Sequence, residues 1–176
     1  ALDINERIKD KIQIARTQVN IGTVYSLTGS YPKAIEHMLQ ALETYEKEAD
    51  KEGMAWTSLS IARLFNRLEI YDKALQYNEI ALNQYRSLRN QNGITLSLTE
   101  QANIYYHSGL NDKALEIAKQ VLAYNSQTQN THAMAANNLL MGIIYFELND
   151  LDKATENLEK ALVLKQFVND SIDVSK

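Results

Sequence analysis

The sequence predicts an all-α fold of the solenoid type, and three observations support this. The chain repeats itself every forty residues without insertion or deletion. It contains 1 Pro and 6 Gly in 176 residues, so little interrupts helix formation. Each period holds two stretches with apolar residues at helical spacing, separated by turn residues. A fixed period of this kind is typical of stacked repeats.

Columns of equivalent residues carry the repeat. A small residue is needed wherever two helices approach closely, and a larger one would overpack the contact at a cost of roughly 1–3 kcal/mol. We expect the aromatic column to fill the space between successive helix pairs. The small columns are Gly22, Ala62, Ala102, Gly142 and Ala34, Ala74, Ala114, Ala154; the aromatic one is Tyr25, Phe65, Tyr105, Tyr145; further columns are Lys33, Lys73, Lys113, Lys153 and Leu42, Leu82, Leu122, Leu162.

Each period is predicted to form two helices. The first helix runs from about 10 to 27, and Gly29 ends it. Ser30 is expected to cap the second helix, which runs over about 31–48 with Pro32 in its first turn. The later pairs are predicted at 52–68 with 71–89, 93–108 with 111–127, and 131–148 with 151–168. Asp10, Asp50, Asn90, Asn130 and Asp170 mark the connections between periods.

These boundaries give a single array of about four repeats with a partial helix at its N-terminal side. We expect residues 1–10 to be the end of a preceding repeat and 171–176 the start of a following segment, so that the chain is a fragment of a longer protein. The repeats are assigned to residues 11–50, 51–90, 91–130 and 131–170.

Composition excludes several classes of function. A net charge of −4 and a pI near 5.4 argue against a nucleic-acid-binding surface. No apolar run is long enough to span a membrane. The absence of Cys excludes disulfides and thiolate chemistry, and it does not fix the compartment. The cytoplasm is preferred, with a periplasmic sensor region as the alternative.

The sequence does not predict an enzyme. His37, His107 and His132 share no short spacing, so no metal site is expected. There is neither a Gly-rich phosphate loop nor a serine elbow. We therefore expect no catalytic residue, metal or cofactor in this chain.

Taken together, the columns resemble the tetratricopeptide repeat, and four aligned copies carry the resemblance over essentially the whole chain. The matching residues are Gly22, Tyr25, Gly29, Tyr31, Ala34 and Ala41; Ala62, Phe65, Tyr71, Ala74 and Ala81; Ala102, Tyr105, Gly109 and Ala114; and Gly142, Tyr145, Ala154 and Ala161. The third repeat departs most from the pattern, with Gln101, Asn111 and Val121 at places where the family has other residues.

The forty-residue period is longer than the thirty-four residues usual in the family, and the proline near the end of each copy is missing. In this the chain looks like the long repeats of kinesin light chains, of polarity adaptors and of peptide-responsive bacterial regulators. The resemblance implies a right-handed superhelix of stacked antiparallel helix pairs. It also implies that the first helix of each pair lines a concave groove for a peptide or partner protein.

Matching to the family's groove-facing places predicts the binding residues. Arg63 and Arg67 share one helical face, and Asn103 and His107 come forty residues after them, which predicts a patch able to hold a carboxylate or a peptide backbone. The full set is Arg16, Asn20, Thr23, Trp56, Ser60, Arg63, Asn66, Arg67, Asn103, Tyr106 and His107.

Each assignment has a simpler alternative. The charged pair can be an ordinary solvated face, and Trp56 can pack between repeats instead of serving as a binding hot spot. Tyr106 and Phe146, one period apart, can stack on a ligand or be partly buried. Val19, Thr23 and Ser60 occupy places where chaperone-tail receptors carry a Lys and Asn clamp, so that function is not expected.

The predicted function is a protein- or peptide-binding scaffold, with an acidic or carboxylate-bearing segment as one candidate partner and self-association as another. The alternative is a ligand-sensing or dimerisation region of a bacterial signalling protein, such as a two-component sensor or a transcriptional regulator.

Overall fold

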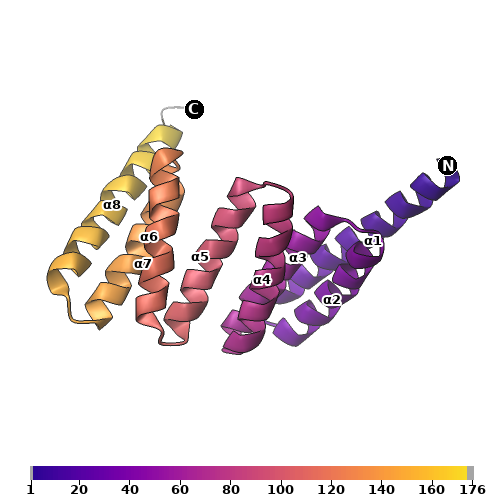
Figure 1. Cartoon of the computed structure of the whole chain (residues 1–176), viewed down its shortest axis with the longest axis horizontal. Coiled ribbons are helices and arrows are strands. Elements are labelled where there is room, and N and C mark those ends of the chain that lie inside the picture. The colour runs from indigo at the N-terminus through magenta and orange to yellow at the C-terminus, as the bar shows by residue number, and fades with distance from the viewer. Residues whose placement is uncertain (1, 174–176) are drawn as a thin grey trace. The chain divides into compact units, whose positions relative to one another are not determined.

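The computed structural model describes the backbone of residues 2–173 and the side chains of residues 7–167. This part of the chain forms eight α-helices and no strand (Figure 1). The helices are α1 (Leu2–Leu27), α2 (Tyr31–Lys47), α3 (Lys51–Arg67), α4 (Tyr71–Ser87), α5 (Gln91–His107), α6 (Asn111–Gln127), α7 (Thr131–Glu147) and α8 (Leu151–Asp173).

The chain divides into two compact units, and the division falls inside α5. The first unit is Ala1–Glu100 and the second is Gln101–Lys176. In the first unit α1 packs on α2, α2 on α3, and α3 on α4. In the second unit α6 packs on α7 and α7 on α8. The eight predicted helices are all present, and α2 to α7 begin and end within two residues of their predicted bounds, whereas α1 begins earlier and α8 ends later than predicted.

One turn joins every helix to the next, and it recurs every twenty residues. Its central residue adopts a positive φ of 52–79°. The amide that follows donates to the carbonyl five residues earlier, for example Ser30 N to Tyr25 O and Asp50 N to Tyr45 O, both within 2.9 Å. This hydrogen bond is typical of a helix that ends at a residue in the left-handed conformation. The residues with positive φ are Gly29, Ala49, Glu69, Arg89, Gly109, Gln129 and Asn149.

Asp or Asn side chains cap the starts of α3, α5, α7 and α8, the last through Asp150, which accepts from the amide of Lys153 at 3.3 Å. Asp50, Asn90 and Asn130 each accept a hydrogen bond from the amide three residues on, at 3.0, 2.9 and 3.1 Å, which stabilises the start of α3, α5 and α7. The predicted cap at Ser30 is wrong, because its side chain makes no such bond at the start of α2. Pro32 removes one of the amides that a cap would serve.

The expected breaks at Asp10 and Asp170 are also not found. Helix α1 continues through Asp10, and α8 runs past Asp170 to Asp173. Elsewhere each turn folds a helix back against its neighbour. Within the described range no helix precedes α1 or follows α8, so neither residue joins two packed helices.

The small columns lie at close helix contacts, as predicted. Ala34, Ala74 and Ala114 are fully buried. A Cβ added to Gly22 would stand 2.9 Å from the carbonyl oxygen of Ala34, and one added to Gly142 would stand 2.7 Å from Cγ of Leu158. These positions admit no larger side chain without movement of the partner helix.

Two members of the aromatic column stack within their own helix pair, whereas Tyr145 of α7 packs against α6 of the preceding pair, as predicted. The ring of Tyr25 stacks on His37, and the ring of Phe65 on Tyr77, at centroid distances of 5.3 and 5.5 Å. Both contacts are within one helix pair, because His37 and Tyr77 lie on the second helix of the same pair. The lysine column gains its explanation here: Lys33, Lys73, Lys113 and Lys153 each place Nζ 5.3–5.5 Å from the centre of the aromatic ring of their own repeat, a cation–π contact.

Because each turn contains a residue with positive φ, replacing an exposed non-glycine residue there by glycine is expected to stabilise the protein. Ala49 has φ 55°, which strains an L side chain but not glycine. After allowing for the greater entropy of glycine in the unfolded chain, Ala49→Gly is expected to raise the free energy of unfolding by roughly 0.5–1 kcal/mol. Urea unfolding followed by circular dichroism measures it. Gly29→Ala, the reverse change at φ 77°, should lower stability, and a gain there would contradict the argument.

Candidate binding surfaces

The first unit contains a cleft on its first helices, which we call the α1–α3–α5 cleft. Its volume is about 510 Å³. The rings of Tyr45 and Tyr85 pack directly on Gly53 and Gly93, where a Cβ would overlap them. The absence of a side chain at these two residues is what lets the rings lie there. The lining residues of the cleft are Arg16, Val19, Asn20, Tyr45, Asp50, Glu52, Gly53, Trp56, Tyr85, Asn90, Asn92, Gly93 and Leu96.

Charged groups surround the two buried phenols. Burial raises the pKa of Tyr45, the Asp50 carboxylate raises it further, and a hydrogen bond from Arg16 opposes them. Burial likewise raises the pKa of Tyr85, with Glu52 adding to the rise and Arg63 opposing it. Both phenols therefore stay neutral well beyond neutral pH. The cleft itself carries one guanidinium and two carboxylates.

Trp56 and Leu96 supply the exposed apolar part of the cleft. They occupy equivalent positions, forty residues apart, on α3 and α5. Trp56 is 50% exposed and Leu96 is 43% exposed. Trp56 is therefore not a core residue, and half of its surface stays accessible. A large half-exposed indole beside polar groups is characteristic of binding hot spots.

Arg63 is paired inside the protein. Its Nε lies 3.4 Å from Oε2 of Glu100, and Nδ2 of Asn66 donates to Oε1 of the same carboxylate at 2.9 Å. Asn66 and Glu100 are both buried, each with 7% exposure. The predicted groove position of Asn66 is therefore wrong: its amide serves a contact between α3 and α5. Glu100 supplies the carboxylate that we expected a ligand to bring to Arg63.

The remaining predicted residues of the first unit lie at or near its surface. Arg16 and Asn20 are exposed and line the cleft. Thr23 and Ser60 each donate to the carbonyl four residues earlier, Val19 and Trp56 respectively. The exposed Arg67 places its guanidinium 6.0 Å from the centre of the Tyr31 ring.

In the second unit Tyr106 is half-buried and held in place. Its hydroxyl donates to Oε1 of Glu147 at 2.8 Å, and this bond raises the pKa of Tyr106. Its ring lies 5.2 Å from that of the exposed His107, and Asn103 is half-buried. Phe146 is an exposed residue of α7. The patch that would join Asn103 and His107 to Arg63 and Arg67 stays a prediction, because the two pairs belong to different units.

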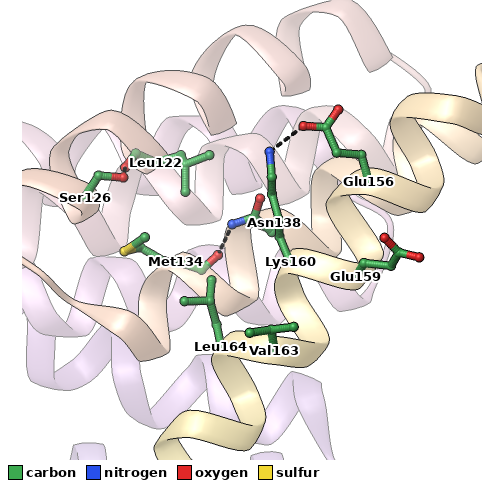
Figure 2. A pocket seen from close by; sticks show the side chains of 9 residues that line it. All are labelled: Leu122, Ser126, Met134, Asn138, Glu156, Glu159, Lys160, Val163 and Leu164. Carbon is green, nitrogen blue, oxygen red and sulfur yellow. Dashed lines mark hydrogen bonds and ion pairs between the residues drawn. The ribbon is translucent and has the colours of Figure 1, made fainter.

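The second unit has a groove that sequence reasoning missed, shown in Figure 2, with a volume of about 590 Å³. Its polar side chains are turned onto their own helices: Asn138 donates to the carbonyl of Met134, Ser126 to that of Leu122, and Lys160 pairs with Glu156 at 2.5 Å. An apolar surface is left between them. The lining residues are Leu122, Ser126, Met134, Asn138, Glu156, Glu159, Lys160, Val163 and Leu164.

One sequence signal could have indicated this groove. Val163 is exposed at the position where the earlier repeats carry Glu43, Asn83 and Ala123. A large apolar residue in a column that is otherwise polar or small marks a local surface feature. The predicted binding residues all lie on first helices, whereas Val163 lies on a second helix.

The described residues also bear on the classes excluded earlier. They contain no group of three or more His, Cys, Asp or Glu side chains arranged to hold a metal ion. In the same range, no helix has the length and apolar character needed to cross a membrane.

Comparison with protein families gives two matches to the tetratricopeptide repeat, over residues 1–87 and 135–166. Together they cover more than half of the sequence and carry the small and aromatic columns of the first, second and fourth repeats. The chain belongs to the tetratricopeptide repeat family. The least regular repeat, residues 91–130, lies in the gap between the matches. A search of curated protein sequences finds no match.

Solved structures of similar fold share about a fifth of the residues. Aspartyl phosphate phosphatase F from Bacillus subtilis aligns with a TM-score of 0.83 and 19% identity, over 94% of this chain and 43% of that one. BtubC (BKLC) from P. vanneervenii aligns at 0.77 and 19%, over 88% and 64%. A Rap protein complexed with Competence and Sporulation Factor aligns at 0.74 and 18%, over 86% and 43%. This chain spans less than two thirds of each.

These likenesses confirm the predicted fold class, an all-α solenoid of tetratricopeptide repeats. The two family matches support a protein-interaction scaffold, since the tetratricopeptide repeat fold is typically non-catalytic.

The contact between Arg63, Asn66 and Glu100 is expected to stabilise the first unit. Glu100→Ala leaves a buried amide and a half-buried guanidinium without this acceptor, which should lower the free energy of unfolding by about 1–3 kcal/mol. Urea unfolding followed by circular dichroism measures the change. The control is Glu156→Ala, which removes a solvent-exposed pair with Lys160 and should cost less than about 1 kcal/mol. Equal effects of the two variants would contradict the assignment.

Proposed function

We propose that this chain is a peptide-binding module whose site is the α1–α3–α5 cleft. The observation that carries the proposal is the pairing of two exposed apolar side chains, Trp56 and Leu96, with polar groups in one concave surface. An apolar side chain of the ligand would cover the indole and the leucine. The amides of Asn20 and Asn92 would bond to the ligand's backbone, as in other extended-peptide sites.

The charges of the cleft favour a cationic ligand over an acidic one. The lining holds one cation, Arg16, and Arg63 is paired with Glu100. Asp50 and Glu52 add two carboxylates to the lining. We therefore propose a ligand segment with an apolar residue next to Lys or Arg. The acidic or carboxylate-bearing segment predicted from the sequence becomes the competing outcome of the test.

The alternative, a sensing region of a bacterial signalling protein, uses the same cleft and differs in its consequence. A sensing region must change its helical packing when the ligand binds, whereas a scaffold holds its partner without such a change. Hydrogen exchange of α1 to α5, with and without a selected peptide, separates the two.

The cleft can be tested with random peptides displayed on phage and selected on the immobilised chain. Selected peptides are expected to combine an apolar residue with Lys or Arg. Because Trp56 is the only tryptophan, binding should shift the intrinsic fluorescence. Leu96→Ser is expected to weaken binding about tenfold, equivalent to ~1.4 kcal/mol.

Leu27→Ser is the matched control, because Leu27 is exposed on α1 and does not line the cleft. It should leave affinity unchanged. Selection of acidic peptides would overturn the proposed charge preference alone. Peptides that bind the parent and Leu96→Ser equally, without any fluorescence shift, would place the site elsewhere.

A further inference from the structure

The α1–α3–α5 cleft consists of two halves that the forty-residue period relates to each other. The first half contains Arg16 of α1 together with Tyr45 and Asp50. The second half contains Trp56 of α3 at the position equivalent to Arg16, and Tyr85 at the position equivalent to Tyr45. The two halves therefore share a phenol and differ in the side chain that the first helix supplies. This difference indicates which ligand group the second half accepts.

The first half shows how this chain arranges a guanidinium of its own. Burial raises the pKa of Tyr45, the Asp50 carboxylate adds to the rise, and the Arg16 guanidinium opposes it. The phenol, the carboxylate and the guanidinium therefore lie near one another. All three residues line the cleft, so the first half already contains its cation.

The second half has a phenol and a carboxylate, but an indole in place of the cation. Burial raises the pKa of Tyr85, Arg63 opposes the rise, and Glu52 adds to it, which places the Glu52 carboxylate near this phenol. Arg63 is paired with Glu100 and is not one of the described residues that line the cleft. Among those lining residues, the second half thus carries a carboxylate and no cation of its own.

Glu52 and Trp56 stand four residues apart on α3, and both line the cleft. Side chains at this separation lie on one face of a helix, with their Cβ atoms ~5–6 Å apart. Trp56 is 50% exposed, and Glu52 is exposed as well. The same helical face therefore presents an aromatic ring and a carboxylate side by side, and both are accessible to a ligand.

A guanidinium suits this pair of groups better than an ammonium does. Because it is planar, it can stack on an indole while its N–H groups donate to a carboxylate beside the ring. Two parallel hydrogen bonds to one carboxylate are possible for Arg and not for Lys. The ammonium of Lys is a compact charge that has no flat face to stack on the ring.

We propose that the second half of the cleft binds an arginine side chain of the ligand, stacked on Trp56 and hydrogen-bonded to Glu52. Leu96, which stands at the equivalent position on α5, would contact the apolar residue next to that arginine. This inference rests on the peptide-binding function proposed above and makes it more specific, because lysine is then not an equivalent ligand residue.

The experiment compares three blocked hexapeptides of alanine that carry Arg, Lys or citrulline between two leucines. Isothermal titration calorimetry measures their affinities, and the fluorescence of the single tryptophan reports whether Trp56 is covered. The Arg peptide should bind about tenfold more tightly than either other peptide, because Lys loses the stacking and citrulline loses the charge. An exposed ion pair alone contributes little, so the preference depends on both contacts together.

Two variants separate the contacts. Glu52→Gln removes the charge at nearly constant size, and Trp56→Leu keeps an apolar side chain but removes the aromatic face. Each should remove most of the preference for Arg over Lys. Glu79→Gln is the matched control, because Glu79 is an exposed carboxylate of α4 outside the described lining of the cleft, and it should leave the preference unchanged. Circular dichroism confirms that the variants are folded, as expected for exposed positions.

Equal affinities for the Arg and Lys peptides would overturn the inference, and so would a preference that survives in both Glu52→Gln and Trp56→Leu. If Leu96→Ser still weakens all three peptides in that case, the proposed cleft stands and the assignment of arginine alone fails. Binding of none of the peptides would overturn the inference as well, and the phage selection described above then decides the proposed function by itself.

Discussion

The fold depends on one backbone interaction, the hydrogen bond that closes each helix across a residue with positive φ. It recurs at seven turns spaced twenty residues apart. Each inner helix consequently has the same length of 17 residues, and equivalent side chains return to equivalent places. Five of the seven turns accept a residue other than glycine despite its cost. That cost is offset because helix packing on both sides requires the chain to reverse at that point. Small, aromatic and lysine columns can form only because this spacing does not vary.

The α1–α3–α5 cleft follows from the same regularity and from one local pairing. Tyr45 with Gly53, and Tyr85 with Gly93, pack a phenol ring on a helix start that has no side chain. The next repeat lacks both members: Asn125 stands at the tyrosine position and Ala133 at the glycine position. Asn125 is buried, and its side-chain amide makes no hydrogen bond among the described residues. The pairing of a phenol ring with a glycine is therefore confined to the first two of these three positions.

Periodicity predicted the helices, their order and the close-packed columns, because these depend on residues at fixed separations along the chain. It failed where a contact depends on residues from different columns. The bond of Asn66 to Glu100 joins α3 to a position on α5 that holds Ser60 and Asn20 in earlier repeats, so no column could indicate it. The groove position of Arg63 stays a prediction, and its guanidinium is already paired with the carboxylate of Glu100. The lysine column was visible in the sequence, whereas its reason, the aromatic ring eight residues before it, required the geometry.

In a repeat protein, the exposure of a residue can be compared with that of the equivalent residues in the other repeats. A leucine that is half exposed on an ordinary protein needs no explanation, since much of any protein surface is apolar. Leu162 differs, because the same column is almost completely covered at Leu42 and Leu82. The exposure of Val24 has the same meaning on α1, since Leu64, Ile104 and Ile144 are buried. Both exposed residues therefore stand at positions that other repeats of the same chain cover. Comparison of equivalent positions identifies them, whereas their composition alone would not.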